Sequence, residues 1–363
     1  MTLSKSIPGI AIIGTQAKGG IRAVIENHKK AGVYGGYETF FIASHDDGNA
    51  LFRVKLAAFA LFRLISLIFR RKISICHLHG SMKGSIYRKA VYISVCRWLG
   101  CKTVFHLHGS EFAKSYNRAG WLYRALVRYV LNTSHKVFVL SDYWKEYVES
   151  ISINQCVCVI NNFPSPEFEA LNEEREFGKK PQVDLLFLGK IGQRKGIYDL
   201  VEAVEYLHIQ GVTGFKVHVG GNGEINKLKQ LIDEKQLEKY FNVVGWVGGN
   251  LKRELLQQSD VLLLPSHNEG LPISILEAFS AGLAVLSTRV GGIPDAITDE
   301  RYGILVEPGT PSSLAEAMLK YINNKRLIET VAQNARQRYD SLYSSRANVE
   351  KIRLELANLL PTY

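Results

Sequence analysis

Short apolar runs alternate along the chain with longer segments in which apolar residues recur at helical spacing. In the first half the runs are IPGIAIIG (7–14), YETFFIAS (37–44), ISICHLHG (73–80), CKTVFHLHG (101–109) and HKVFVLS (135–141). Helical patterns lie between them, near 20–32, 50–71, 85–99 and 117–132. Because strands that alternate with helices usually pair in parallel, this half predicts a parallel sheet covered by helices.

The same alternation returns after an interruption. The segment 161–182 carries prolines and many charges without apolar periodicity, and we interpret it as a linker. Beyond it come the runs VDLLFLGK (183–190), FKVHVGG (215–221), FNVVGWV (241–247) and DVLLLPS (260–266), with helical patterns near 196–209, 224–236 and 250–258. Further helices are expected over 311–338 and 341–360.

The pattern therefore predicts an α/β protein with two doubly wound units in tandem. We expect an N-terminal Rossmann-like domain over 1–165, a C-terminal Rossmann-like domain over 182–340 and a final helix over 341–363. A chain of 363 residues is long enough for two cores. Since doubly wound sheets bind ligands at the carboxyl ends of their strands, the active site is expected in a cleft between the domains.

Composition indicates a globular protein of a reducing compartment. Hydrophobic residues make up 46% of the chain and charged residues 22%. The five cysteines include no C-x-x-C pair, and no secretory signal pattern is apparent, which favours free thiols and a cytoplasmic location. The longest apolar stretch, 56–69, has 14 residues and contains Arg63, whereas a membrane span needs about 20.

Positive charge is concentrated in the first half. Residues 1–163 hold 22 of the 45 Lys and Arg but only 8 of the 34 Asp and Glu, whereas the remainder has a small negative excess. Such asymmetry favours an anionic partner for this half: nucleic acid, acidic lipid or a phosphorylated substrate. The sequence shows no nucleic-acid-binding module, so we expect no nucleic-acid partner.

Two basic and aromatic stretches favour a membrane surface as the partner. LFRVKLAAFALFRLISLIFRRK (51–72) mixes cations with Leu and Phe, and YNRAGWLYRALVRYV (116–130) does the same. A helix of this kind can lie among lipid headgroups, with its apolar side in the acyl chains. The alternative is a buried helix with basic ends. We expect peripheral attachment to the anionic inner leaflet.

Three loops between a strand and a helix carry the candidate chemistry. The first, GTQAKGG, places Gly19 and Gly20 before a helix, where backbone amides can approach a phosphate or sugar, although a plain tight turn fits equally well. The second, LGKIGQRKG, places Arg194 and Lys195 beside helix amides. Two cations there form a suitable clamp for a diphosphate, but they also suit an ordinary surface.

The third loop, SHNEGLPISILEAFSAG (266–282), carries two glutamates eight positions apart, Glu269 and Glu277. Gly270 allows the loop to bend and Pro272 suits a first helical turn, so the helix amides point towards the crevice. The arrangement fits a nucleotide sugar, with phosphates on amides and hydroxyls on carboxylates. The alternative is a glutamate favoured by the helix dipole together with a solvated one.

Taken together, these segments resemble the retaining glycosyltransferases of family 4, which have the GT-B fold. The specific element is E-x7-E, here EGLPISILE, followed by AFSAGLAVLSTRVGGIPDAI, and GKIGQRKGIYDLVEAV is the next strongest. The resemblance implies that Arg194 and Lys195 neutralise the departing diphosphate and that Glu277 holds the ribose hydroxyls. It also implies a C-terminal helix that packs back on the N-terminal domain.

The resemblance assigns the remaining roles as well. Glu269 would contact the transferred sugar, Gly270 and Leu271 would offer amides, and Gly19 and Gly20 would border the donor from the other domain. HLHGSEF (106–112) is similar to the loop that faces the donor sugar, which makes His108 the expected contact. HLHG occurs twice, so His79 is a rival, and either histidine could simply be a loop residue.

The implied activity is retaining, metal-independent hexosyl transfer from a nucleotide-diphosphate sugar, with a UDP-sugar as first expectation and GDP-mannose as second. The acceptor is expected to be a lipid-linked or oligosaccharide hydroxyl in O-antigen, capsule or exopolysaccharide synthesis. No Asp-x-Asp metal motif is evident, and neither a metal nor a cofactor is expected. The alternatives are a non-enzymatic nucleotide-sugar-binding scaffold and a nucleotide-sugar 2-epimerase.

Overall fold

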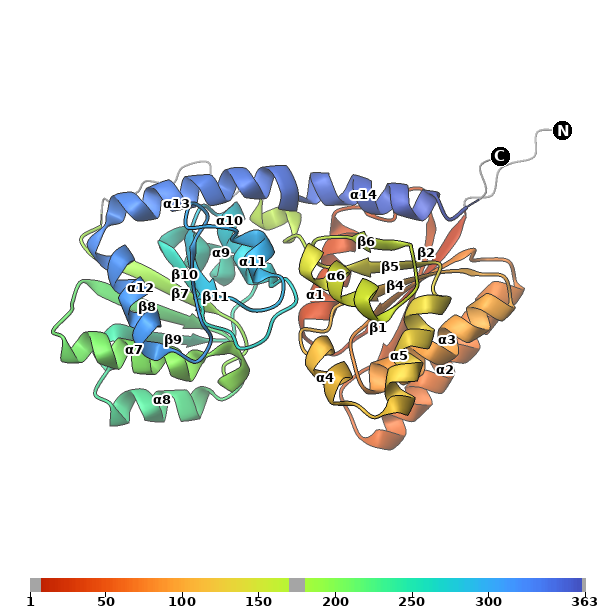
Figure 1. Cartoon of the computed structure of the whole chain (residues 1–363), viewed down its shortest axis with the longest axis horizontal. Helices are drawn as coiled ribbons and strands as arrows, with labels where there is room; N and C mark the ends of the chain where they lie inside the picture. Colours follow the sequence, from red (N-terminus) through yellow and green to blue (C-terminus); the bar gives the residue numbers. More distant parts are fainter. Residues whose placement is uncertain (1–7, 170–179, 361–363) are drawn as a thin grey trace. The chain divides into compact units, whose positions relative to one another are not determined.

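The computed structural model describes residues 8–169 and 180–360, which form two compact units (Figure 1). Unit 1 comprises Met1–Asn162 and Ser345–Tyr363, and unit 2 comprises Phe163–Ser344. Residues 170–179 of the expected linker lie outside the described residues. The chain thus enters unit 2 once and returns to unit 1 at its end.

Unit 1 is built on a six-stranded parallel sheet in the order β2-β1-β3-β4-β5-β6. The strands are β1 (Gly9–Thr15), β2 (Glu38–His45), β3 (Ile75–Gly80), β4 (Lys102–Leu107), β5 (Lys136–Val139) and β6 (Val157–Val159). The helices are α1 (Gly20–Lys30), α2 (Ala50–Phe69), α3 (Gly84–Trp98), α4 (Phe112–Arg118), α5 (Trp121–Thr133), α6 (Asp142–Ile151) and α14 (Ser345–Ala357).

Unit 2 has a second six-stranded parallel sheet, in the order β12-β11-β10-β7-β8-β9. Its strands are β7 (Val183–Leu188), β8 (Phe215–Gly220), β9 (Phe241–Gly245), β10 (Val261–Leu264), β11 (Ala284–Thr288) and β12 (Ile304–Val306). Its helices are α7 (Ile197–Ile209), α8 (Ile225–Glu234), α9 (Gly249–Gln258), α10 (Ile273–Ser280), α11 (Ile293–Ala296), α12 (Pro311–Asn323) and α13 (Lys325–Arg338).

These two parallel sheets confirm the predicted fold class. In such a fold helices cover both faces of the sheet, so its central strands are buried along their whole length. All residues of β3, β7 and β11 are buried. In unit 2 the strand side chains form one core with α7 and α12, which pack against each other. The expected cleft between the two domains stays a prediction.

Two predicted helices are each divided in the structure. The pattern over 117–132 belongs to α4 and α5, which are separated by an extended Ala119 and Gly120. The pattern over 311–338 belongs to α12 and α13, because the backbone at Asn324 is not helical and its side chain accepts a hydrogen bond from the amide of Leu327. Asn324 thus caps a new helix, which periodicity alone did not indicate.

The final helix, α14, belongs to unit 1. The Arg353 guanidinium donates to the carbonyl oxygen of Gly32 at 2.7 Å, and Lys136 at the start of β5 forms an ion pair with Glu355. Val349, Ile352 and Leu356 of α14 are buried. A segment made last in the chain therefore completes the unit that is made first.

Strand order places one topological switch point in each sheet. In unit 1 the chain proceeds in opposite directions from β1 and β3, and in unit 2 from β7 and β10. Loops at such a point diverge and leave a crevice at the carboxyl ends of the strands, where doubly wound proteins bind ligands. The candidate residues follow β1, β7 and β10, except His108, which follows β4 beside β3.

Candidate functional site

Arg194 and Lys195 lie at the switch point of unit 2, on the 3-10 turn Gln193–Lys195 that follows β7. Gly196 ends the turn in the left-handed conformation, with φ of 70°, and begins α7. A Cβ at Gly196 would lie 1.8 Å from the carbonyl oxygen of Pro265, which follows β10. Only glycine can bring these two loops together so closely.

The carboxylate of Glu269 lies beside the two cationic side chains of this turn. Its Oε1 lies 2.5 Å from Lys195 Nζ, 3.9 Å from Arg194 Nη1 and 2.7 Å from the Oγ of Ser266, which donates to it. The residue is only 6% exposed, so the carboxylate is buried. The structure therefore brings Arg194, Lys195 and Glu269 together.

The loop after Glu269 is held by backbone contacts. The Gly292 amide donates to the Gly270 carbonyl oxygen at 2.7 Å, and Leu271 is buried. Gly291 has φ of 56°, and a Cβ there would lie 1.9 Å from the Glu269 carbonyl oxygen. The VGG segment noted in the sequence thus fixes the backbone on which Glu269 and Gly270 stand.

Glu277 lies within α10 and is 3% exposed. Its Oε1 is 2.5 Å from Nζ of Lys252 on α9, and this ammonium lies 5.1 Å from the ring centre of Phe168. Lys252 was missed by sequence reasoning, because nothing local to α9 indicates a carboxylate partner 25 positions later. Each glutamate of the pair thus has its own lysine partner.

This arrangement can bind an anion and polyhydroxyl groups side by side. Without a ligand, an ion pair that is largely removed from water keeps the lysine close to its carboxylate. When a phosphate binds, the lysine ammonium can turn towards it. The carboxylates would then accept hydrogen bonds from hydroxyls. Two further segments stand at the ends of neighbouring strands: GGNGE (220–224) at the end of β8 and the segment around Trp246 after β9. The family resemblance implies diphosphate and base contacts there.

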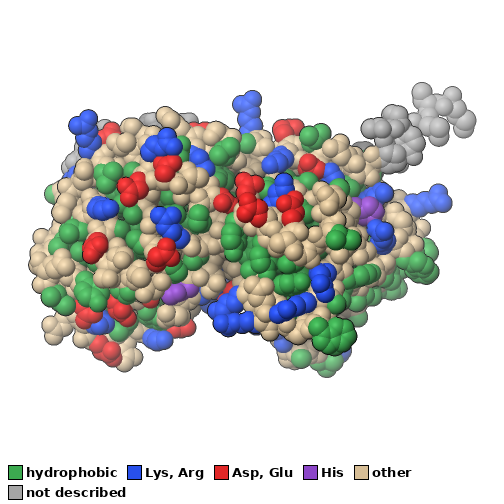
Figure 2. Space-filling model, viewed as in Figure 1, with side chains coloured by type: hydrophobic (Ala, Val, Ile, Leu, Met, Phe, Trp, Pro, Cys, Tyr) green, Lys and Arg blue, Asp and Glu red, His purple; other side chains and the backbone are tan. Residues whose placement is uncertain are grey.

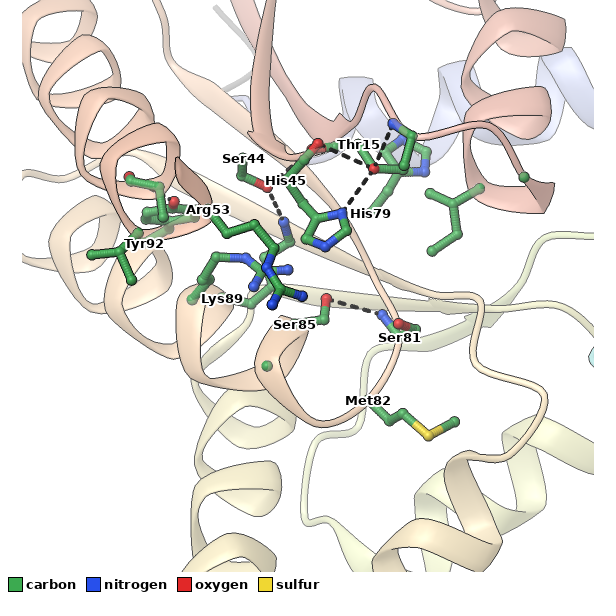
Figure 3. A pocket seen from close by; sticks show the side chains of 18 of the residues that line it. Thr15, Ser44, His45, Arg53, His79, Ser81, Met82, Ser85, Lys89 and Tyr92 are labelled. Carbon is green, nitrogen blue, oxygen red and sulfur yellow. Dashed lines mark hydrogen bonds between the residues drawn. The ribbon is translucent and has the colours of Figure 1, made fainter. Parts of the chain in front are cut away.

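A cavity of about 860 Å³ lies at the switch point of unit 1. The loop after β1 lines it with Gly19 and Gly20, which have no heavy atom within 4 Å of an added Cβ, and the loop after β3 lines it with Ser81 and Met82 (Figure 3). α1 begins at Gly20, so its amides lie at the rim. The cavity joins the predicted glycine loop to side chains that the sequence did not single out.

Positive charge surrounds this cavity. Lys18, Arg53, Arg88 and Lys89 line it, and the described lining residues include neither Asp nor Glu. The sequence has no acidic residue between Asp47 and Glu111. Lys89 is 1% exposed and donates from Nζ to Ser44 Oγ at 2.9 Å, and burial together with Arg88 lowers its pKa to about 7. The cavity therefore suits an anionic group.

The same two helices that carry Arg53, Arg88 and Lys89 also line the cavity with apolar side chains. α2 contributes Val54, Ala57 and Leu61, and α3 contributes Val91. Hydrophobic side chains also emerge on the surface of the helices packed here, where Figure 2 shows them beside Lys and Arg. Those with more than 60% of their surface exposed include Phe59, Phe62 and Phe69 of α2, Trp98 of α3, and Trp121 and Leu122 of α5. An amphiphile with an anionic head matches a lining that contains both cations and apolar side chains.

The two candidate histidines contact each other. His79 lines the cavity. Its Nδ1 lies 2.9 Å from Nε2 of His108, the residue after β4. Burial lowers the pKa of His108 to about 3. Parallel pairing of β3 with β4 explains the contact, since it sets the two HLHG segments side by side. The two HLHG segments therefore form one structural feature, and the choice of His108 over His79 as the sugar contact stays a prediction.

Site residues of unit 1 and unit 2 are each brought to a switch point of their own sheet. Within 8–169 and 180–360, the structure contains no helix with the length and apolar content required to span a bilayer. The basic, aromatic α2 is thus an element that lies within unit 1 and presents part of its apolar side to the surface.

Family models match almost the whole described chain. Glycosyl transferases group 1 matches residues 169–338, and Glycosyltransferase Family 4 matches residues 19–168. The boundary between the two matches lies close to the boundary between the two units.

Individual relatives share about a quarter of their residues. The putative colanic acid biosynthesis glycosyltransferase WcaL of Salmonella typhimurium is 28% identical over 188 residues, which span 50% of this chain but only 45% of WcaL. An Escherichia coli enzyme, UDP-Gal:alpha-D-GlcNAc-diphosphoundecaprenol alpha-1,3-galactosyltransferase, is 26% identical over 311 residues, or 81% of this chain and 78% of that enzyme.

Solved structures share the fold. Anabaena HepE, crystallised in complex with UDP, superposes with a TM-score of 0.73 at 15% identity and covers 96% of this chain and 100% of its own. From the two sheets, the residues at their switch points and the two family matches, we conclude that the chain belongs to the family 4 and group 1 glycosyltransferases and has the GT-B fold.

Proposed function

We propose that the protein transfers a hexosyl unit from a nucleotide-diphosphate sugar, first a UDP-sugar, to a hydroxyl of a lipid-linked or oligosaccharide acceptor, with retention at the anomeric carbon. The observation that carries this proposal is the cluster of Arg194, Lys195 and Glu269 at the switch point of unit 2. The galactosyltransferase, which is named for UDP-Gal, and HepE, which was crystallised in complex with UDP, support the choice of nucleotide.

In the proposed reaction, the bond between the anomeric carbon and the donor phosphate breaks and its electron pair leaves with the diphosphate. The acceptor oxygen forms the new bond on the same face, through an oxocarbenium-like transition state, and its proton passes to the departing phosphate. Arg194 and Lys195 stabilise the charge that develops on this phosphate, in place of a metal ion. Glu269 orients the sugar, Glu277 holds the ribose and His108 contacts the sugar from unit 1.

The cavity of unit 1 supports the lipid-linked choice of acceptor. Its cations Arg53, Arg88 and Lys89 would face the phosphates of the acceptor, and the wall of α2 and α3 would face the first part of its lipid chain. We place the enzyme at the inner face of the cell membrane, in the cytoplasm, in the synthesis of a surface polysaccharide. The relative named for colanic acid biosynthesis supports that pathway class.

The test begins with donor binding. Thermal unfolding is followed for the full chain with a panel of nucleotides and nucleotide sugars, and stabilisation by one diphosphate nucleotide is expected. Glu277→Gln keeps the shape of the side chain and should reduce that stabilisation. Glu316→Gln, the same change at an exposed position of α12, is the matched control and should not.

The second stage tests the chemistry. With the donor identified, acceptor lipids are screened and the anomeric configuration of the product is read by NMR. An inverted product would contradict the retaining mechanism. Absence of any nucleotide-dependent stabilisation at millimolar concentration would contradict the donor site itself.

A further inference from the structure

Unit 1 contains a buried group of histidines that the proposed reaction does not use. His77 and His79 lie on β3 and His106 on β4, and the register pairs His79 with His106. Residues two positions apart in a strand point to the same face, so His77 and His79 project together. On this face the ring of His28 from α1 lies 5.8 Å from those of His79 and His106.

We propose that His77, His79 and His106 bind a divalent transition-metal ion, with zinc as the best match. Each offers one ring nitrogen, and these three atoms lie within 4.8 Å of one another. Three imidazoles are a ligand set that zinc accepts in proteins, and imidazole also binds copper and nickel. Among the described residues these three histidines form the one such group.

The distances agree with tetrahedral coordination. Two nitrogens bound to zinc at about 2.0–2.1 Å with a tetrahedral angle lie about 3.3 Å apart. His77 Nε2 and His106 Nδ1 are separated by 3.3 Å. The His79 nitrogen lies within 4.8 Å of both. His79 also lines the cavity of unit 1, which gives an ion a route from solvent (Figure 3).

Neighbouring groups orient two of the ligands. Tyr34 Oη lies 3.1 Å from Nδ1 of His77, and His108 Nε2 lies 2.9 Å from Nδ1 of His79. A ligating histidine commonly donates its other ring N–H to such a partner, which fixes the ring and raises its basicity. In both residues this leaves Nε2 for the metal.

The surroundings also favour occupation. The Nε2 atom of His79 is buried and has no hydrogen-bond partner within the part of the chain that the structure describes. A buried polar atom without a partner is costly, and a metal ion would satisfy it.

The experiment uses the full chain without a histidine tag. Elemental analysis of protein purified without chelators should find about one zinc per chain. After exhaustive chelation, added zinc should raise the melting temperature, and cobalt(II) should produce the visible absorption bands of a tetrahedral site. Protein without metal, together with no zinc-dependent shift and no cobalt bands, would show a metal-free imidazole network and overturn the proposal.

Variants locate the ion. His77→Gln and His106→Gln should each lose the metal and the zinc-dependent shift. His135→Gln, whose ring contacts Thr103 at the start of β4, is the control and should keep both. If both ligand variants retain zinc, the ion lies elsewhere in the protein, and this result refutes the proposed site. If these variants fail to fold, the cobalt spectrum of the unaltered chain decides. Nucleotide-induced stabilisation, which depends on unit 2, is measured in parallel, so failure of this site and failure of the proposed function are distinct.

Discussion

At the residue scale, the donor cluster in unit 2 pairs its charges before any ligand is bound. Lys195 and Glu269 are 13% and 7% exposed in their side chains, so their ion pair is largely removed from water. The pair keeps Lys195 in place, and Ser266 and Arg194 would still contact Glu269 when Lys195 turns to a phosphate. A cation can thus move to the leaving group without leaving a bare carboxylate behind.

Lys195→Met should therefore lower kcat by about 100-fold or more, since one preorganised electrostatic contact to the departing diphosphate is lost. Initial rates with the identified donor and acceptor provide the measurement. Lys235→Met removes another partly buried lysine of unit 2, paired with Glu205 at 2.6 Å outside the cluster, and should leave kcat unchanged. Equal rates for the Lys195 variant and the unaltered enzyme would remove Lys195 from the mechanism.

Lys89 predicts a pH dependence of stability. Its pKa is about 7 in the folded protein, against 10.5 ordinarily, because burial and Arg88 lower it more than Cys76 raises it. Between these values the unfolded chain binds more protons than the folded one, so the free energy of unfolding contributed by Lys89 rises with pH. Below about pH 7 the cost of burying the charge is present in full.

Urea denaturation from about pH 7 to pH 9 tests this. The unaltered protein should become more stable with rising pH relative to Lys89→Met, whereas exposed Lys114→Met should follow the unaltered protein throughout. A constant difference between Lys89→Met and the unaltered protein across that range would contradict a buried lysine that loses its proton on folding.

At the element scale, tight contacts between loops position the chemistry. Gly196 and Gly211 have almost the same left-handed φ, 70° and 72°, but only Gly196 approaches another backbone closely. Gly211→Ala should cost about 1–2 kcal/mol, the usual penalty of that conformation. Gly196→Ala should cost clearly more and weaken nucleotide binding, because the 1.8 Å approach to Pro265 forces the loops apart. Denaturation midpoints of the two variants, measured together, check this, and equal midpoints would contradict it.

Helix α2 predicts how the protein associates with lipid. Phe59 and Phe62 are 62% and 70% exposed and lie three positions apart, on one side of the helix. Removing both from an acyl layer should reduce binding about a hundredfold or more, since each buried phenylalanine contributes about 1.5–3 kcal/mol and about 1.4 kcal/mol is tenfold.

Sedimentation with anionic liposomes at low salt provides the measurement. The double variant Phe59→Ser, Phe62→Ser should remain in the supernatant, and Ile209→Ser, an equally exposed apolar residue of unit 2 at 76%, should still sediment. Added salt should weaken binding of the unaltered protein, because the neighbouring cations act through screened charge. Failure of the unaltered protein to sediment would refute membrane association.

Elements were predicted well where apolar runs were long and poorly where they were short. β7 and α7 begin and end within two residues of their expected limits, because strand and helix periodicities differ strongly there. By contrast, α6 and β6 were not predicted, since β6 spans only Val157–Val159 and offers too few residues for a pattern. Local caps such as Asn324 also escaped detection, because capping depends on one side chain rather than on periodicity.

At the scale of the whole molecule, sequence reasoning found residues adjacent to strands but not their partners. Glu277 was singled out from its spacing, whereas Lys252 was found only when α9 was placed beside α10. The histidine group was missed for the same reason, since register between β3 and β4 creates it. Motifs thus indicate which loops matter, and pairing of elements decides which side chains meet.

The division into units predicts that unit 2 is self-sufficient for donor binding. It has its own sheet, core and switch point, with the cluster of Lys195 and Glu269 inside it. The fragment Phe163–Ser344 should fold and show the same nucleotide-induced rise in melting temperature as the full chain. The fragment with Glu277→Gln should not. A folded fragment without that rise would mean that unit 1 supplies essential contacts to the nucleotide.

Because the chain returns to unit 1 at its end, unit 1 is completed only after unit 2 has been synthesised. A ribosome adds about 5–20 residues per second, so the stretch that encodes unit 2 takes roughly 10–40 s to translate. Throughout this interval the surface that later receives Val349, Ile352 and Leu356 of α14 has no cover. Unit 2 can be complete while unit 1 still waits, and nascent unit 1 is accordingly the part that most depends on chaperones.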